Sequence, residues 1–160
     1  IILTTALVAL LAAGCAQKEA ATAATASATP AVEDGVRVIQ LTGNDQMKFN
    51  MTSIELKVGE EVRITLTNIG TMPKVAMAHN LVVLKAGSDA MAYSMAAAPA
   101  AATDYLPADL QDQVVAHTKM LGPKESDSVT LKFTEAGEFP FLCSFPAHFQ
   151  VGMKGMITVK

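Results

Sequence analysis

The clearest signal of the fold is the stretch Val62-Arg63-Ile64-Thr65-Leu66-Thr67, in which apolar and polar side chains alternate strictly. Successive side chains of a β-strand point to opposite faces of a sheet, so this pattern predicts a strand with one buried face. The same alternation returns at residues 54–58 and 129–134. Further short apolar stretches at residues 36–39, 79–84, 139–143 and 156–159 bring the set to about seven predicted strands.

The connections between these strands are rich in Gly, Pro, Asn and Asp, which favours an all-β sandwich or barrel over a βαβ fold. Residues 88–102 depart from the strand pattern. They are rich in Ala and Met and begin with Ser88 or Asp89, either of which can cap a helix. This segment predicts one short helix inserted between strands.

Length and composition limit the classes of function. The chain has 160 residues, which suffice for one domain and a short extra segment. Apolar residues make up 51% and the net charge is −3, so a core can be buried and no general affinity for nucleic acid is expected.

The N-terminal region predicts a targeting segment. Residues 1–13 are almost all apolar or small and lead into Gly14-Cys15. The run is shorter than the ~20 residues of a membrane span and resembles the apolar part of a secretory signal. We interpret residues 1–14 as a signal peptide truncated at its start and Cys15 as the acylated N-terminus of a bacterial lipoprotein. An ordinary cleaved signal with an incidental Cys is the alternative.

Two further segments follow from composition. Residues 15–35, rich in Ala and Thr, predict a flexible tether because they offer little apolar surface to bury. Residues 36–160 are the predicted folded domain.

Potential metal ligands recur at five-residue intervals near the C-terminal end, as Cys143, His148 and Met153. A second imidazole, His79, opens a predicted strand. Two His and one Cys with a weak axial Met form a trigonal site that suits both oxidation states of copper. We therefore hypothesise that these four residues bind copper. His117 has no such neighbour and is predicted to lie at the surface.

Cysteine usage supports the hypothesis. If Cys15 is acylated, Cys143 has no disulfide partner, and a metal-ligand role would explain a free thiol in an oxidising compartment. Zinc also binds Cys and His, but a thioether as fourth group argues against zinc.

Six motifs in the same order resemble those of azurins, the type 1 blue copper proteins: residues 43–50, 72–74, 79–80, 115–119, 143–148 and 153–155. The resemblance covers about residues 36–160. It implies a Greek-key β-sandwich of the cupredoxin class with one copper ion held by His79, Cys143 and His148, and at long range by Met153.

The resemblance also implies roles for neighbouring residues. The carbonyl of Ala78 would approach the copper axially, at a position where azurins carry Gly. Hydrogen bonds of Asn80, Ser144 and the backbone N–H of Phe145 would support the ligands.

The sequence also departs from the azurin pattern. The spacing from His148 to Met153 is one residue longer and matches auracyanin, a related cupredoxin. Leu81 replaces the buried Trp of azurins, and the domain lacks the Cys pair of their disulfide. Asn68 replaces a histidine that titrates behind the site, so no pH-dependent potential is expected through that group.

The implied function is the transfer of single electrons, with no substrate bond made or broken, so enzymatic activity is not expected. His148 is the predicted electron exit, because it lies on a loop expected to be exposed. It is surrounded by apolar residues that predict a docking surface: Met47, Met72, Met77, Phe145, Pro146, Ala147 and Phe149.

The resemblance implies redox proteins as partners, typically c-type cytochromes or a membrane redox complex. Their contacts are expected to be small and short-lived. We expect a monomer, anchored through its lipid to a membrane and facing the periplasm.

Other classes of function stay open at this point. A protein that stores or delivers Cu(I) would also use Met-rich loops, and a reversible, coloured redox couple would distinguish electron transfer from it. A copper enzyme such as a nitrite reductase needs two domains and a second His cluster, which 160 residues with three His do not offer.

Overall fold

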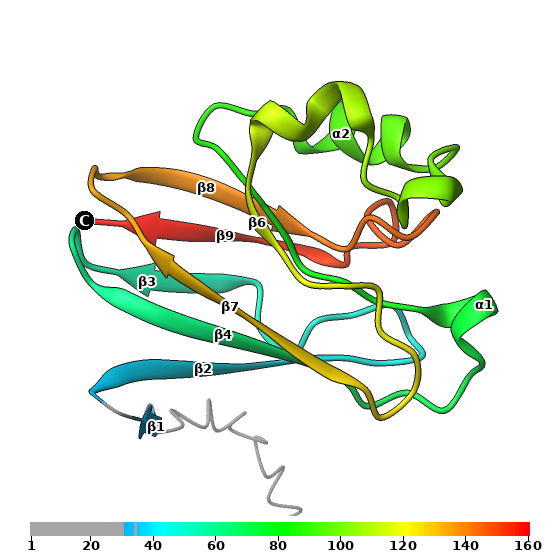
Figure 1. Ribbon diagram of the computed structural model, residues 1–160, viewed down its shortest axis with the longest axis horizontal. Helices are drawn as coiled ribbons and strands as arrows, with labels where there is room; N and C mark the ends of the chain where they lie inside the picture. The colour runs from blue at the N-terminus through cyan, green and yellow to red at the C-terminus, as the bar shows by residue number, and fades with distance from the viewer. Residues whose placement is uncertain (1–30, 34) are drawn as a thin grey trace, which may run out of the picture.

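The computed structural model of the chain describes residues 31–33 and 35–160, and in it two β-sheets pack face to face (Figure 1). One sheet has the strand order β1 (Ala31–Glu33), β2 (Val36–Gly43), β4 (Glu61–Asn68) and β7 (Ser126–Lys132). The other has the order β3 (Ser53–Leu56), β9 (Lys154–Val159), β8 (Gly137–Leu142), β5 (Val82–Leu84) and β6 (Val114–His117).

The pairing of the strands confirms the predicted Greek-key β-sandwich. Strands β2 and β4 pair in parallel, as do β3 and β9, and the other pairs are antiparallel. Parallel neighbours require chain crossovers, and here the chain passes from one sheet to the other between β2 and β3 and again between β3 and β4.

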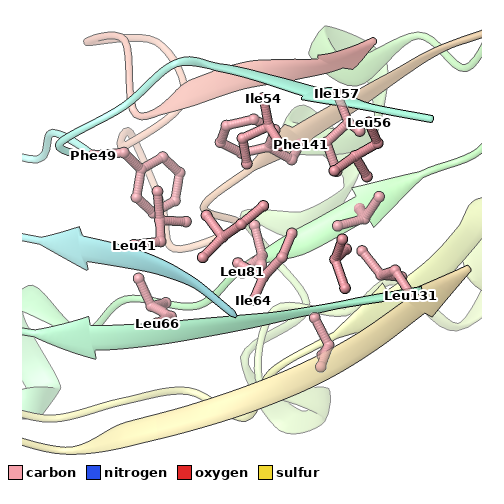
Figure 2. Close-up of a cluster of buried hydrophobic side chains, with 14 of the residues drawn as sticks. Leu41, Phe49, Ile54, Leu56, Ile64, Leu66, Leu81, Leu131, Phe141 and Ile157 are labelled. Carbon is pink, nitrogen blue, oxygen red and sulfur yellow. The ribbon is translucent and has the colours of Figure 1, made fainter. Parts of the chain in front are cut away.

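The alternation of residues 62–67 sets the inner face of β4. Val62, Ile64 and Leu66 are fully buried, whereas the residues between them are partly exposed. Figure 2 shows Ile64 and Leu66 facing side chains of the opposite sheet, which include Phe141. The ring centroids of Phe141 and of Phe49, which bridges to β2, lie 5.7 Å apart. Burying each such side chain contributes about 1.5–3 kcal/mol.

The strand bounds differ from the predicted ones by a few residues, and three differences matter for the site or the domain bounds. The strand predicted from residue 79 begins only at Val82, and His79 instead forms an isolated bridge with Leu121. Strand β6 was not predicted, because its four residues, Val114–His117, are too few to show a clear alternation of apolar and polar side chains. Residues 31–33, placed by the sequence in the tether, pair as β1 with β2.

The predicted helix over residues 88–102 is shorter than expected. Helix α2 (Ala90–Ala97) is capped by the Asp89 side chain, which accepts hydrogen bonds from the N–H groups of Met91 and Ala92. The α-helix ends before Pro99, since proline lacks the N–H that a helix needs. The short helices η1 (Ala101–Thr103), η2 (Ala108–Gln113) and α1 (Lys74–Met77) were not predicted.

Residues 88–113, here called the insertion, build a second hydrophobic cluster outside the main core. Helix α2 lies over β8 (Figure 1). The cluster between them consists of Val82, Leu84, Tyr93, Ala97, Leu142 and Phe149. The insertion thereby packs against the segment that follows β8.

The predictions for the signal peptide, for Cys15 and for most of the tether lie outside the described residues. Among the residues that the structure does describe, every helix is too short or too polar to span a lipid bilayer.

Candidate metal centre

His79 lies between α1 and β5, and main-chain hydrogen bonds fix its position. Its N–H donates to the Leu121 carbonyl (3.1 Å), and the Leu121 N–H donates to the His79 carbonyl (2.7 Å). The neighbours Ala78 and Asn80 are buried, as is His79 itself. The imidazole therefore points from a segment with very little freedom to move.

Cys143 and His148 lie on the segment that joins β8 to β9, which we call the ligand loop (residues 143–153). The Cys143 N–H donates to the Met153 carbonyl (3.0 Å), so the two ends of the loop pair with each other. The Met153 N–H in turn donates to the His148 carbonyl (2.9 Å). The loop is thus closed by its own backbone.

The three predicted equatorial ligands meet in one buried place. The Nδ1 atoms of His79 and His148 lie 3.3 Å apart, and Cys143 Sγ lies 3.4 Å from His148 Nδ1. Their ligand atoms all fall within 4.8 Å of one another. Imidazole and thiolate ligands lie ~2.0–2.3 Å from a metal ion, and this places neighbouring ligands of a trigonal site about 3.5 Å apart. The donor set therefore fits a bound copper ion.

The site disfavours charge when no cation is present. Burial raises the pKa of the Cys143 thiol to about 12, although hydrogen bonds from the Asn80 and Phe145 backbones oppose the rise. Burial also lowers the pKa of His148 to about 4, and the proximity of His79 adds to this effect. Both groups are therefore neutral near pH 7, and a bound cation would replace the thiol proton.

His79 has a different electrostatic environment. Burial lowers its pKa, whereas a contact with the Asn44 backbone and the negative charge of Asp45 act in the opposite direction. Its Nε2 is buried and makes no hydrogen bond of good geometry. Desolvation is the largest effect, so this imidazole is also neutral and available to bind a metal.

Gly43 provides space for two of the predicted ligands. A Cβ atom at this position would lie 2.8 Å from the Met153 methyl group and 2.9 Å from the His79 ring. Met153, fully buried, therefore lies beside His79 only because residue 43 has no side chain. The sequence alone assigns no role to Gly43, although it belongs to one of the azurin-like motifs.

Asn80 joins the two ligand segments. Its Nδ2 donates to Ser144 Oγ (2.8 Å), and its Oδ1 accepts a hydrogen bond from the Ser144 N–H (2.8 Å). All of these groups are buried, so leaving any of them unpaired would be costly. Asn80 and Ser144 are two of the three residues for which the sequence analysis expects hydrogen bonds that support the ligands.

Asn68 is buried behind the His79 segment. Its Nδ2 donates to the Leu121 carbonyl (3.1 Å), and its Oδ1 accepts from the Gly70 N–H (2.9 Å). An amide does not titrate, so this position cannot supply a pH-dependent charge next to the site.

The predicted docking residues fall into three groups by exposure. Met72 (39% exposed) and Ala147 are exposed, and Met47, Met77, Phe145 and Pro146 are half-buried. Phe149 is only 5% exposed, so its assignment to the docking surface was wrong. Its ring lies in the second hydrophobic cluster, because the insertion covers that side of the ligand loop.

The two histidines whose exposure was considered differ in how far solvent reaches their side chains. His117 lies exposed on β6, as predicted. The loop of His148 is exposed at Ala147 and Gln150, as predicted, but the His148 side chain itself is only 1% exposed. The Phe145 ring, whose centroid lies 4.8 Å from that of His148, is among the groups that cover it.

Comparisons with known proteins agree with this geometry. Residues 36–160 match the family model described as copper binding proteins, plastocyanin/azurin family. An azurin from Alcaligenes faecalis is 38% identical over 125 residues, which cover 76% of this chain and 96% of that protein. The outer membrane protein H.8 of Neisseria meningitidis serogroup B is 42% identical over 119 residues, covering 72% of this chain and 63% of that protein.

Among solved structures, a dithionite-reduced auracyanin from the photosynthetic bacterium Roseiflexus castenholzii superposes with a TM-score of 0.68 and 33% identity. The match covers 77% of this chain and 96% of the auracyanin. The two-sheet fold, the buried group of two imidazoles and a thiol, and these matches agree with one another. The chain belongs to the plastocyanin/azurin family of copper-binding proteins, as an azurin-like cupredoxin.

Proposed function

We propose that this protein is a type 1 copper electron carrier that passes single electrons between redox proteins of the cell envelope. One observation carries the proposal: His79, Cys143 and His148 place their donor atoms within 4.8 Å of one another in a buried site. Copper bound there supplies a one-electron couple between Cu(II) and Cu(I). No substrate-binding role is needed for this function, and we do not expect enzymatic activity.

The chain contributes a site whose geometry changes little. The His79 segment is paired with Leu121, and the ligand loop is closed between Cys143 and Met153. The hydrogen bonds of Asn80 hold these two segments together. A fixed set of ligands leaves little rearrangement to accompany a change of charge, which favours rapid electron transfer.

We assign weak axial roles to two further groups. Met153 is buried beside the His79 ring, in the space left by Gly43. Ala78 directly precedes His79 and has an extended backbone (φ −81°, ψ 157°). Its carbonyl would be a fifth group that helps to hold the copper ion.

A docking surface at the copper end follows from the exposed and half-buried apolar residues there. We propose that it consists of Met47, Met72, Met77, Phe145, Pro146 and Ala147, without Phe149. Electrons would pass between His148 and the partner across this thin apolar layer. Such surfaces support small, short-lived contacts, and we propose c-type cytochromes or a membrane redox complex as partners of a monomer.

The N-terminal segment determines the proposed location. We propose that residues 1–14 direct export, that acylated Cys15 anchors the protein in a membrane, and that residues 15–35 mainly serve as a tether for the domain of residues 36–160. One relative carries the name outer membrane protein H.8, which is compatible with a place in the cell envelope. Incorporation of labelled fatty acid that is lost in Cys15→Ser would support the anchor.

Titration of the copper-free protein with Cu(II), followed by visible absorption, tests the function. We expect one equivalent of copper to produce an intense thiolate-to-copper band that Cys143→Ser abolishes and His117→Gln leaves unchanged. A reversible midpoint potential should accompany the band. Tight Cu(I) binding without a coloured Cu(II) form would instead indicate copper storage or delivery and would contradict the proposal.

A further inference from the structure

The ligand loop is held from outside by the insertion as well as from inside by the β-sandwich. The Phe149 side chain lies in the second hydrophobic cluster. Gln150 Nε2 donates to Ser94 Oγ of α2 (3.3 Å). The ring of Tyr105 packs edge-on against that of Phe145, with centroids 5.1 Å apart and an interplanar angle of 63°. Three residues of the loop therefore contact the insertion, one near its start and two near its middle.

Phe145 connects this outer contact to the predicted ligands. Its ring centroid lies 4.8 Å from that of His148, with the planes tilted by 45°. Its backbone N–H donates to the Cys143 thiol and lowers the pKa of that group. The His148 N–H donates back to the Phe145 carbonyl (3.2 Å). A shift of Phe145 would therefore reach both the sulfur and the imidazole.

The backbone around Tyr105 is built to present its ring to the loop. Asp104 (φ 52°) and Tyr105 (φ 60°) are consecutive residues in the left-handed region, which is unfavourable for residues with a Cβ atom. The Tyr105 N–H donates to the Ala100 carbonyl (2.9 Å), and the Thr103 hydroxyl donates to the Leu106 carbonyl (2.8 Å). These hydrogen bonds hold the turn in a conformation that the chain would not adopt by itself.

We propose that Tyr105 is a positioning residue for the copper site, which acts through Phe145 on the orientation of the His148 ring and of the Cys143 sulfur. The proposal rests on the proposed function and adds a residue to it from the insertion. Ring pairs at this distance and angle favour one relative orientation, so Tyr105 restricts where the Phe145 ring can lie. Phe145 then restricts the imidazole that packs against it.

The first test uses the copper-free protein, so its result is independent of metal binding. We expect Tyr105→Leu to accelerate hydrogen exchange of the His148 and Met153 amides by about two- to tenfold, the effect of losing one aromatic pair. The Leu121 amide, which pairs with His79, should exchange at its original rate. Tyr105→Phe keeps the ring and should behave like the original protein.

The second test uses the copper-loaded protein. We expect Tyr105→Leu to shift the visible band and the copper hyperfine splitting and to slow electron self-exchange, whereas Tyr105→Phe restores all three. Leu110→Ala is the matched control, because Leu110 packs against the same second cluster. It should lower the melting temperature without changing the spectrum or the exchange of the loop amides.

Three outcomes would overturn the proposal: unchanged loop exchange and spectrum in Tyr105→Leu, a Tyr105→Phe variant that resembles Tyr105→Leu, or a Leu110→Ala variant that reproduces its effects. If Tyr105→Leu does not fold, the same measurements on Tyr105→Met, whose flexible side chain fills irregular gaps, replace it. A protein that binds no coloured copper would contradict the proposed function, while the exchange measurements on the copper-free form would still decide the role of Tyr105.

Discussion

The two segments that meet at the candidate copper site are held in different ways. The His79 segment is fixed by main-chain pairing with Leu121 and by the buried amide of Asn68. The ligand loop is closed by its own backbone, but its position depends on side chains such as Phe149 that reach into the insertion. Main-chain pairing tolerates many side-chain changes, whereas side-chain contacts do not. Side-chain substitutions should therefore disturb the position of the ligand loop more than that of the His79 segment.

The largest expected effect comes from removing the anchor of the loop. Phe149→Ala should lower the free energy of unfolding by about 3–5 kcal/mol and weaken copper binding by about tenfold or more. Leu81→Ala, in the main core next to the first segment, should lower stability by about 2–5 kcal/mol with a smaller effect on copper binding. Urea unfolding and Cu(II) titration measure the two quantities. If Leu81→Ala weakens copper binding as much as Phe149→Ala, the comparison fails.

The two imidazoles of the copper-free protein should contribute differently to the loss of stability at low pH. The pKa of His148 is about 4 in the folded protein against 6.5 for the free side chain. Between these values the unfolded chain binds more protons, so the free energy of unfolding falls as the pH is lowered from 6.5 to 4. The expected loss approaches about 3 kcal/mol at the lower end.

The control for this effect uses variants that cannot titrate. His148→Gln should flatten the dependence of stability on pH between 6.5 and 4 more than His79→Gln does, because Asp45 and the Asn44 backbone partly offset the burial of His79. Urea midpoints at pH 7 and pH 4.5 provide the measurement. Equal flattening by both variants would contradict the difference between the two segments.

Removing the hydrogen bonds that link the two segments should have an intermediate effect on stability. Asn80→Ala leaves the buried Ser144 N–H without its partner and should cost about 1–3 kcal/mol of stability. A double-mutant cycle with Ser144→Ala should yield a coupling energy of about 0.5–3 kcal/mol. Additive effects of the two changes would mean that the Ser144 hydroxyl does not contribute to the link between the segments.

The smallest expected effects concern two alanines, one in each segment. Ala147 has a φ of 68°, so Ala147→Gly should stabilise the copper-free protein by about 0.5–1 kcal/mol. Ala78 has an ordinary φ of −81°, so Ala78→Gly should destabilise it by about 0.5–1 kcal/mol. Melting temperatures of the two variants should therefore move in opposite directions. Shifts of the same sign would contradict the difference in backbone strain.

The sequence predicts the sandwich and the equatorial site because both depend on short-range patterns. The alternation in β4 reports its buried face directly, and the spacing of Cys143 and His148 places both on one loop. His79 was proposed as the fourth ligand because it opens a predicted strand, and the resemblance to azurins supported this choice, but no local pattern fixes a contact between residues 69 positions apart. The structure supplies that contact through the pairing with Leu121.

The outer side of the site could not be predicted in the same way. Phe149 was assigned to the surface because an apolar residue beside a ligand looks the same in sequence whether solvent or another segment covers it. The cover comes from the insertion, whose path depends on left-handed residues such as Asp104 and Tyr105. The presence of an Asp and a Tyr in the sequence does not predict the left-handed conformation. Gly43 was likewise visible in the sequence, but its purpose emerges only when Met153 and His79 are seen on either side of the missing Cβ atom.

The place of β9 has a consequence for biosynthesis. This strand is the last in chain order, yet it lies inside its sheet between β3 and β8. A growing polypeptide therefore cannot complete the second sheet until residues 154–159 have been made. Pairing partners so distant along the chain also slow folding, since the entropy of closing long loops must be overcome first. Capture of copper in a fixed site then becomes a late event, and a chain cut before β9 would carry all four proposed ligands but lack the central strand that helps to hold them in place.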